Sequence, residues 1–229
     1  MADDELPVPR KEDVLFASNQ AAWRMDAIID FRPGHDYAYR EGYRRTGRIL
    51  TEYAAERGEV DFLVYPICHA YRHYVELSLK RLMLVACRLL DREMTDKERK
   101  IQTGSHNLQI LWETFKLINK EVDDETGIEP APPEQMEGIE SYIGQIHAID
   151  EGSFSFRYAL TKSGAVNLEG VDRINLAQFS ECMEALCNYL DGWDSYFAEY
   201  VQLANERRDD YARDMYSDMG DPMYGKSGY

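Results

Sequence analysis

The chain has 229 residues, of which 44% are hydrophobic and 30% are charged, and its formal net charge at pH 7 is −16. This apolar fraction is enough to build a core, which excludes a disordered or fibrous class. No run of about 18 or more apolar residues occurs, and the first residues, MADDELPVPRKED, are acidic and contain proline. We therefore expect neither a membrane span nor a secretory signal, and a cytoplasmic location.

The charge is unevenly distributed along the chain. Residues 61–120 contain ten Lys and Arg against seven Asp and Glu, a net charge of +3, whereas residues 121–206 contain three against eighteen, a net charge of −15. Because phosphate contacts require clustered Lys and Arg, an anion such as RNA could meet only the first segment. The acidic segment indicates either a solvated surface or a surface that binds a protein partner.

Helical periodicity dominates the sequence. Apolar residues recur at spacings of three and four, and no period-two alternation is long enough to require a sheet, so the predicted fold is all-α. The first predicted helix covers Val14 to Ile29 and stops near Pro33 and Gly34, which punctuate the chain. The second covers Asp36 to Arg57 and ends at Gly58, a residue type that favours a helix C-terminus.

The third predicted helix, from about Val60 to Leu90, has apolar residues on nearly every side. This pattern is typical of a central, buried helix, which Pro66 should bend or begin. After a break at Gly104, Ser105 is predicted to cap a fourth helix, whose large apolar residues lie at positions 108–118.

The second half of the chain alternates loops and helices. Residues 123–133, DDETGIEPAPP, form the clearest predicted loop, and a fifth helix follows from Glu134 to Ile149. Residues 150–173 are too rich in Gly and Ser for a helix and predict an ordered loop or a small hairpin. The last predicted helix runs from Asn175 to about Arg208, and the aperiodic residues 209–229 predict a disordered acidic tail.

These elements predict one helical-bundle domain at residues 13–208, preceded by a flexible N-terminus at residues 1–12. The cysteines lie in apolar helical patterns and have none of the CxxC spacings of closed zinc sites. We therefore expect reduced thiols within the core. They are Cys68, Cys87, Cys182 and Cys187.

One concentrated polar feature, the polar stripe, lies in the third predicted helix. Its members are separated by three, one, three and four residues, so they share one face of that helix. Charged groups are rarely buried without partners, so this face must pair internally, meet another subunit or line a pocket. The stripe consists of His69, Arg72, His73, Glu76 and Lys80.

Two interpretations of the polar stripe stay open. The first is a satisfied structural network in which Arg72 and Lys80 each pair with Glu76, one turn away. The second is a site in which His73 or His69 acts as acid or base near neutral pH while the cations hold a phosphate, which suits phosphodiester chemistry or RNA binding. A metal site built from the two histidines and the carboxylate is disfavoured, because the two cations repel a divalent ion, and no cofactor is expected.

Further candidates lie outside this helix. His106 is predicted first as a capping or hydrogen-bonded residue and second as a catalytic group. Arg157 lies between two aromatic residues in the loop after the fifth helix. We interpret it first as a loop anchor that pairs with a carboxylate such as Glu76 or Asp150, and second, together with Tyr158, as a residue that contacts an anion.

Four segments carry a resemblance to a known family. In order they are EGYRRTGRILTEY, DFLVYPICHAYRHYVELSLKRLM, GSHNLQILWETF and IHAIDEGSFSFRYALTKSG. Over roughly residues 37–200 the chain resembles bacterial members of the HEPN superfamily, which are helical-bundle proteins that often dimerise. The resemblance implies an HEPN-like antiparallel helical bundle, a homodimer, and a role linked to RNA, as in toxin–antitoxin systems or antiviral defence.

Many HEPN proteins are metal-independent ribonucleases whose activity rests on an Arg and a His with about four to six residues between them, brought together across a dimer. The pair with this spacing here is Arg99 and His106, and it straddles a loop instead of lying on a late helix. With eighteen Arg and five His in the chain, about one such match is expected by chance. The family's catalytic residues are therefore not carried over.

Two functional hypotheses follow. In the first, the protein binds RNA or cleaves it without a metal, in bacterial stress response or phage defence. In the second, it is a non-catalytic interaction module whose acidic residues 121–206 bind a protein partner. For the first hypothesis we assign catalysis to Arg72, His73, Glu76 and His106, and substrate binding to Lys80, His69, Arg157 and Tyr158.

Overall fold

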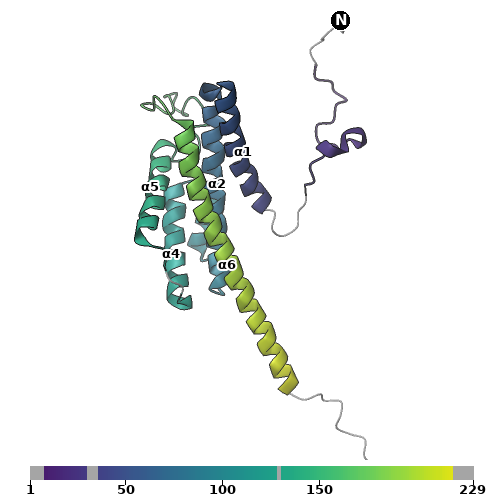
Figure 1. Ribbon diagram of the computed structural model, residues 1–229, viewed down its shortest axis with the longest axis vertical. Coiled ribbons are helices and arrows are strands. Elements are labelled where there is room, and N and C mark those ends of the chain that lie inside the picture. Colours follow the sequence, from purple (N-terminus) through teal and green to yellow (C-terminus); the bar gives the residue numbers. More distant parts are fainter. Residues whose placement is uncertain (1–7, 30–35, 128–129, 219–229) are drawn as a thin grey trace, which may run out of the picture. The chain divides into compact units, whose positions relative to one another are not determined.

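The computed structural model describes residues 8–29, 36–127 and 130–218. It divides into two units, Met1–His35 and Asp36–Tyr229. The described part of the first unit contains a 3-10 helix, η1 (Gln20–Met25), and the α-helices of the described chain all belong to the second unit (Figure 1).

The prediction of an α-helix from Val14 to Ile29 is wrong. The segment contains only η1, which is capped by Asn19, and the rest of its described backbone is not helical. Its large apolar side chains are exposed, Phe16 to 98%. An isolated helix of this length is marginal in water unless it buries an apolar face, so apolar spacing alone does not form one here.

The second unit is an all-α bundle, as predicted. Its first two helices, α1 (Asp36–Arg57) and α2 (Val60–Leu89), agree with the predicted second and third helices. Gly58 follows α1 with φ of +71°, a left-handed conformation that glycine adopts at little cost. Pro66 lies inside α2, which continues through it.

A short helix, α3 (Asp96–Gly104), is an addition that apolar periodicity does not predict. It begins with a capping box, in which Thr95 and Glu98 each accept a hydrogen bond from the other's backbone N–H. The prediction that Ser105 caps the next helix is wrong, because Ser105 ends α3. Asn107 caps α4 (Leu108–Thr126) instead.

The predicted loop at residues 123–133 is shorter in the structure, because α4 continues to Thr126 and ends at Gly127 in a left-handed conformation. The fifth predicted helix is confirmed as α5 (Pro133–Ile149). The segment after it is an irregular loop. Within the described ranges there is no strand, and a single antiparallel bridge joins Leu160 to Val166 in this loop.

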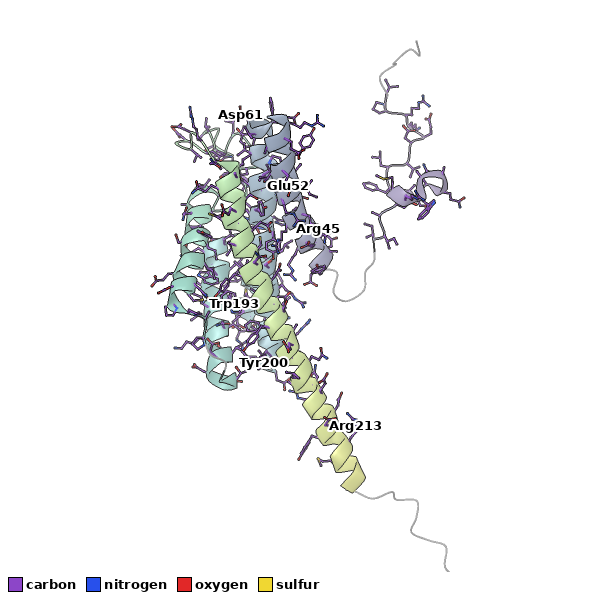
Figure 2. All side chains as sticks on the ribbon, in the orientation of Figure 1. Arg45, Glu52, Asp61, Trp193, Tyr200 and Arg213 are labelled. Carbon is purple, nitrogen blue, oxygen red and sulfur yellow. The ribbon has the colours of Figure 1, made fainter. Side chains whose placement is uncertain are left out.

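The last helix, α6 (Leu176–Asp218), begins where predicted but runs past the predicted end at Arg208. Residues 209–218, which we expected to belong to a disordered tail, continue the helix beyond the bundle, where Figure 2 labels Arg213. The remaining residues of that predicted tail, 219–229, lie outside the described residues. No helix in the described ranges combines the length and the apolar character needed to cross a membrane.

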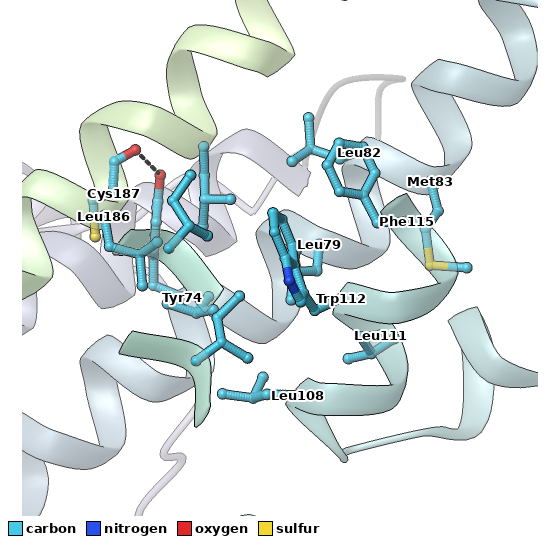
Figure 3. Packing of buried hydrophobic residues seen from close by; sticks show 14 of the residues in the cluster. Tyr74, Leu79, Leu82, Met83, Leu108, Leu111, Trp112, Phe115, Leu186 and Cys187 are labelled. Carbon is cyan, nitrogen blue, oxygen red and sulfur yellow. Dashed lines mark hydrogen bonds between the residues drawn. The ribbon is translucent and has the colours of Figure 1, made fainter. Parts of the chain in front are cut away.

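The central element of the bundle is α2, which contacts α1, α4 and α6. It supplies Leu79 and Leu82 to a core that also contains Trp112 and Phe115 from α4 and Leu186 from α6 (Figure 3). All five side chains are at most 2% exposed. Burial on several faces explains why the sequence of α2 is apolar nearly all round.

One close contact fixes the spacing of α1 and α2. A Cβ atom added at Gly47 would lie 2.6 Å from a ring carbon of Tyr71, so the absence of a side chain lets α1 pack directly on this ring. The Tyr71 hydroxyl lies 2.9 Å from the Ser180 hydroxyl and donates to Glu184 at 3.0 Å, both on α6. One tyrosine therefore joins three helices.

Candidate functional site

The polar stripe leads into a buried hydrogen-bond network centred on Arg72, which is 1% exposed. Arg72 Nη1 donates to Glu76 Oε2 at 3.0 Å, and Nη2 donates to the backbone carbonyl of His106 at 2.5 Å. Nε donates to the Asp150 carbonyl at 3.3 Å, and the Asp150 carboxylate lies 3.2 Å away. One guanidinium thus joins α2, the α3–α4 connection and the end of α5.

Glu76 is the carboxylate that the cations of this network share. Its Oε1 accepts a hydrogen bond from Lys80 Nζ at 2.9 Å and lies 2.9 Å from His106 Nδ1. Burial alone would raise the pKa of Glu76, but the bonds and charge of Lys80, with the bonds from His106 and Arg72, hold this pKa below its usual value. Glu76 is therefore ionised at neutral pH.

The network reaches solvent at His106. Glu76 is 1% exposed and Lys80 is 14% exposed, whereas His106 is 60% exposed. Because an ionised carboxylate only accepts hydrogen bonds, His106 Nδ1 must carry the hydrogen, and a neutral ring then keeps Nε2 as an acceptor. A buried carboxylate that orients an exposed imidazole is an arrangement suited to general acid–base chemistry.

Asp150 closes the network on its other side. Its Oδ1 accepts the backbone N–H groups of Phe154 at 2.7 Å and Ser155 at 3.0 Å, so it also holds the start of the loop after α5. We predicted Asp150 only as a possible partner of Arg157, and it pairs with Arg72 instead. Its position before a Gly- and Ser-rich loop was the available signal, because Asp side chains accept N–H groups of turns. We refer to Arg72, Glu76, Lys80, His106 and Asp150 as the Arg72 network.

The other two residues of the polar stripe lie apart from these hydrogen bonds. His73 packs edge-on against Tyr43 of α1, with ring centroids 4.4 Å apart, and stacks with His69 at 5.8 Å. Burial lowers the pKa of both histidines below 6.5, and the charges of Arg157 and Arg72 lower that of His69 further. Both rings are therefore mainly neutral at pH 7, and His73 packs between α1 and α2.

Arg157 and Tyr158 belong to the loop after α5. Arg157 Nε donates to the Ser153 carbonyl at 2.6 Å, and its guanidinium lies 5.1 Å from the ring centre of Phe154 and 5.6 Å from that of Tyr158. Arg157 thus anchors the loop through a backbone carbonyl and not through Glu76 or Asp150. Tyr158 is 54% exposed.

Arg99 and His106, the pair with the HEPN spacing, bond to different carboxylates. Arg99 donates to Glu93 at 3.2 Å on the exposed side of α3, while His106 bonds to Glu76. The histidine of this pair therefore belongs to the Arg72 network, and its arginine does not.

A second group of charges, the α1–α6 ion-pair cluster, explains part of the uneven charge distribution. Arg44 of α1 lies 2.6 Å from Glu184 and 2.7 Å from Asp191 on α6. Carboxylates of the acidic segment are thus neutralised by cations from the first half of the chain. The cluster consists of Arg40 and Arg44 of α1, Glu184, Asp191 and Asp194 of α6, and Arg81, which α2 contributes through its contact with Asp194.

The thiols and carboxylates do not gather into a metal site in the described part of the chain. All four cysteines are free, and Cys182 is the one of them that is not buried. Across the described ranges, no group of three or more His, Cys, Asp and Glu side chains is placed to hold a metal ion.

No family model, no curated protein and no solved structure matches this chain. The all-α bundle is established by the structure, and the resemblance to the HEPN superfamily stays a prediction.

Proposed function

We propose that this protein cleaves RNA without a metal ion, with His106 as the acid–base group and Glu76 as the carboxylate that orients it. One observation carries the proposal: an imidazole that is 60% exposed is bonded through Nδ1 to an ionised carboxylate that is 1% exposed. The cytoplasmic location, the HEPN-like homodimer and a role in bacterial stress response or phage defence belong to the same proposal.

In the proposed reaction, His106 Nε2 takes the proton of a ribose 2′-hydroxyl, and the 2′-oxygen attacks the adjacent phosphorus. The bond from phosphorus to the 5′-oxygen breaks, a 2′,3′-cyclic phosphate forms, and the imidazolium returns its proton to the leaving 5′-oxygen. Lys80, whose Nζ binds the same Glu76 oxygen as His106, supplies positive charge near the phosphate. Arg72 is a positioning residue, because its bonds are to Glu76 and to backbone carbonyls.

The test is incubation of the full chain with total RNA and a labelled tRNA pool in EDTA. We expect cleavage by the wild type, and losses of about 10² to 10⁴-fold in His106→Ala, the range typical of a general acid–base group. Glu76→Gln should also lose activity, because a neutral amide no longer fixes the charge and orientation of the imidazole. His73→Ala should retain activity, since His73 packs against Tyr43.

Two results would contradict the proposal. Cleavage that survives in His106→Ala but not in His73→Ala would move the acid–base role to the other histidine. Intact RNA in every lane, with all variants folded by circular dichroism, would exclude RNA cleavage by the isolated protein and favour the second candidate.

The second candidate is an interaction module that binds a basic protein. It is favoured by exposed carboxylates on α5 and α6 outside the α1–α6 ion-pair cluster, which include Glu134, Glu137, Glu181, Glu199 and Glu206. Charge-reversed variants of these residues should slow association with such a partner in a salt-dependent way. Association rates that do not change with salt would argue against it.

A further inference from the structure

A pocket of about 240 Å³ lies between α2, α5, α6 and the loop that joins the last two helices. It is separate from the exposed imidazole of His106, which does not line it. Its lining is mostly apolar, and the apolar side chains include Ile146, Ile149, Phe156, Ile174, Phe179 and Met183.

A few side chains in the lining of the pocket are polar. Tyr142 and Gln145 come from α5, Asn175 precedes α6, and Gln178 lies in its first turn. A few hydrogen-bonding groups within an apolar lining are typical of pockets that bind and orient small molecules.

Charge restricts the class of ligand. The one charged residue in the lining is Arg72, whose guanidinium already meets the carboxylates of Glu76 at 3.0 Å and Asp150 at 3.2 Å. The wall therefore offers no free charge to a ligand. A charged molecule would lose its hydration on entry without gaining a partner, so the pocket favours a neutral one.

Size restricts the ligand further. An apolar cavity of about 150 Å³ is sufficient to bind benzene in an engineered protein. The volume here is larger, about 240 Å³, and is enough for one or two fused rings.

We propose that this pocket binds a compact, neutral, mostly apolar molecule of the size of a bicyclic aromatic ring, with one hydrogen-bonding edge toward the polar lining. This site is independent of the proposed RNA cleavage, because the ligand would neither touch His106 nor require it.

Cys182 makes the proposal directly testable. Cys68 and Cys182 both line the pocket, but Cys182 is the one of the four cysteines that is not buried. The experiment measures the rate at which N-ethylmaleimide alkylates Cys182 in the full chain, located by peptide mass spectrometry. Indole is the probe, and indole-3-acetate and tryptamine carry the same ring with a negative or a positive charge. Calorimetric titration of indole gives a second readout that needs no thiol.

We expect indole to slow alkylation saturably, by about tenfold when its concentration is about ten times its Kd. The two charged analogues should slow alkylation less than about twofold at the same concentration, because neither can keep its hydration in the pocket. Equal protection by a charged analogue would overturn the assignment of a neutral ligand. An alkylation rate that indole does not change, together with no heat of binding, would overturn the site.

A filling substitution locates the binding. Gln178 lies at the exposed rim of the pocket, so Gln178→Trp should place a large ring in the opening without disturbing the core, and should abolish protection by indole. Gln202→Trp is the matched control, because Gln202 is an exposed glutamine of the same helix outside the pocket. Protection that persists in Gln178→Trp as in the wild type would overturn the location.

Discussion

Two groups of charges hold the bundle together, and they differ in their access to water. In the Arg72 network, Arg72, Glu76 and Asp150 are each 1% exposed. In the α1–α6 ion-pair cluster, Arg40 is 4% exposed, but Arg44 is 17% exposed and Asp191 is 36% exposed. Water can replace a partner lost at Arg44 but not one lost at Arg72, so removal of these two arginines should differ greatly in its cost to stability.

The largest effect expected is that of Arg72→Met. It removes the guanidinium that Glu76 and Asp150 share while both carboxylates stay buried, and breaking a buried ion pair typically costs about 3–5 kcal/mol of unfolding free energy. Urea unfolding followed by circular dichroism measures this loss. The double variant Arg72→Met, Glu76→Met should lose less unfolding free energy than the sum of the losses in the two single variants. Losses that simply add would show that the two residues do not belong to one network.

The next effect tests the packing beside the ion-pair cluster. Gly47→Ala places a Cβ against the Tyr71 ring and should cost about 1–3 kcal/mol of unfolding free energy through overpacking. Gly42→Ala is the matched control on the same helix, because its Cβ would meet nothing within 4 Å. That control should stabilise α1 by about 0.5–1 kcal/mol, since alanine favours a helix more than glycine does. Equal effects of the two substitutions would contradict the close contact.

A smaller effect is expected in the ion-pair cluster itself. Arg44→Ala removes contacts to Glu184 and Asp191, and we expect a loss of about 1 kcal/mol that decreases as salt is added. Arg45→Ala, on the exposed side of α1 (Figure 2), should leave stability nearly unchanged. A loss from Arg44→Ala as large as that from Arg72→Met would remove the difference between the two groups.

The smallest effect is a dependence on pH. The folded pKa values of His69 and His73 lie below 6.5, so the unfolded chain binds protons more readily, and stability decreases as pH falls from 6.5 toward those lower values. His73→Asn should reduce the slope of unfolding free energy against pH in this window. Chemical unfolding at several pH values measures the slope, and an unchanged slope would show that His73 is not the group that titrates.

The sequence predicts the fold well where periodicity coincides with burial. The pattern of α2 is apolar on nearly every face, and this helix lies at the centre of the bundle. The same spacing between Val14 and Ile29 predicts a helix that is not formed, because those side chains are exposed. The short and polar α3 is not predicted by apolar periodicity. The capping box of Thr95 and Glu98 nevertheless marks its start in the sequence.

The candidate site was only partly predictable. The spacing of Arg72, Glu76 and Lys80 predicts their contacts, because residues four apart meet on a helix. The contacts of His106 and Asp150 to this helix join residues about 30 or more positions away, for which no local rule exists. His73 lies on the same helical face, but Tyr43 of α1 lies beside it, so its ring packs against α1 instead of joining the network.

The position of Arg72 also bears on the order of events during folding. Its bonds to His106 and Asp150 close chain separations of 34 and 78 residues, so we expect them to form late, after α2, α4 and α5 have come together. Interactions that are absent from the transition state leave the folding rate nearly unchanged and act on the rate of unfolding. We therefore expect the Arg72 network to slow unfolding of the native bundle more than it speeds folding.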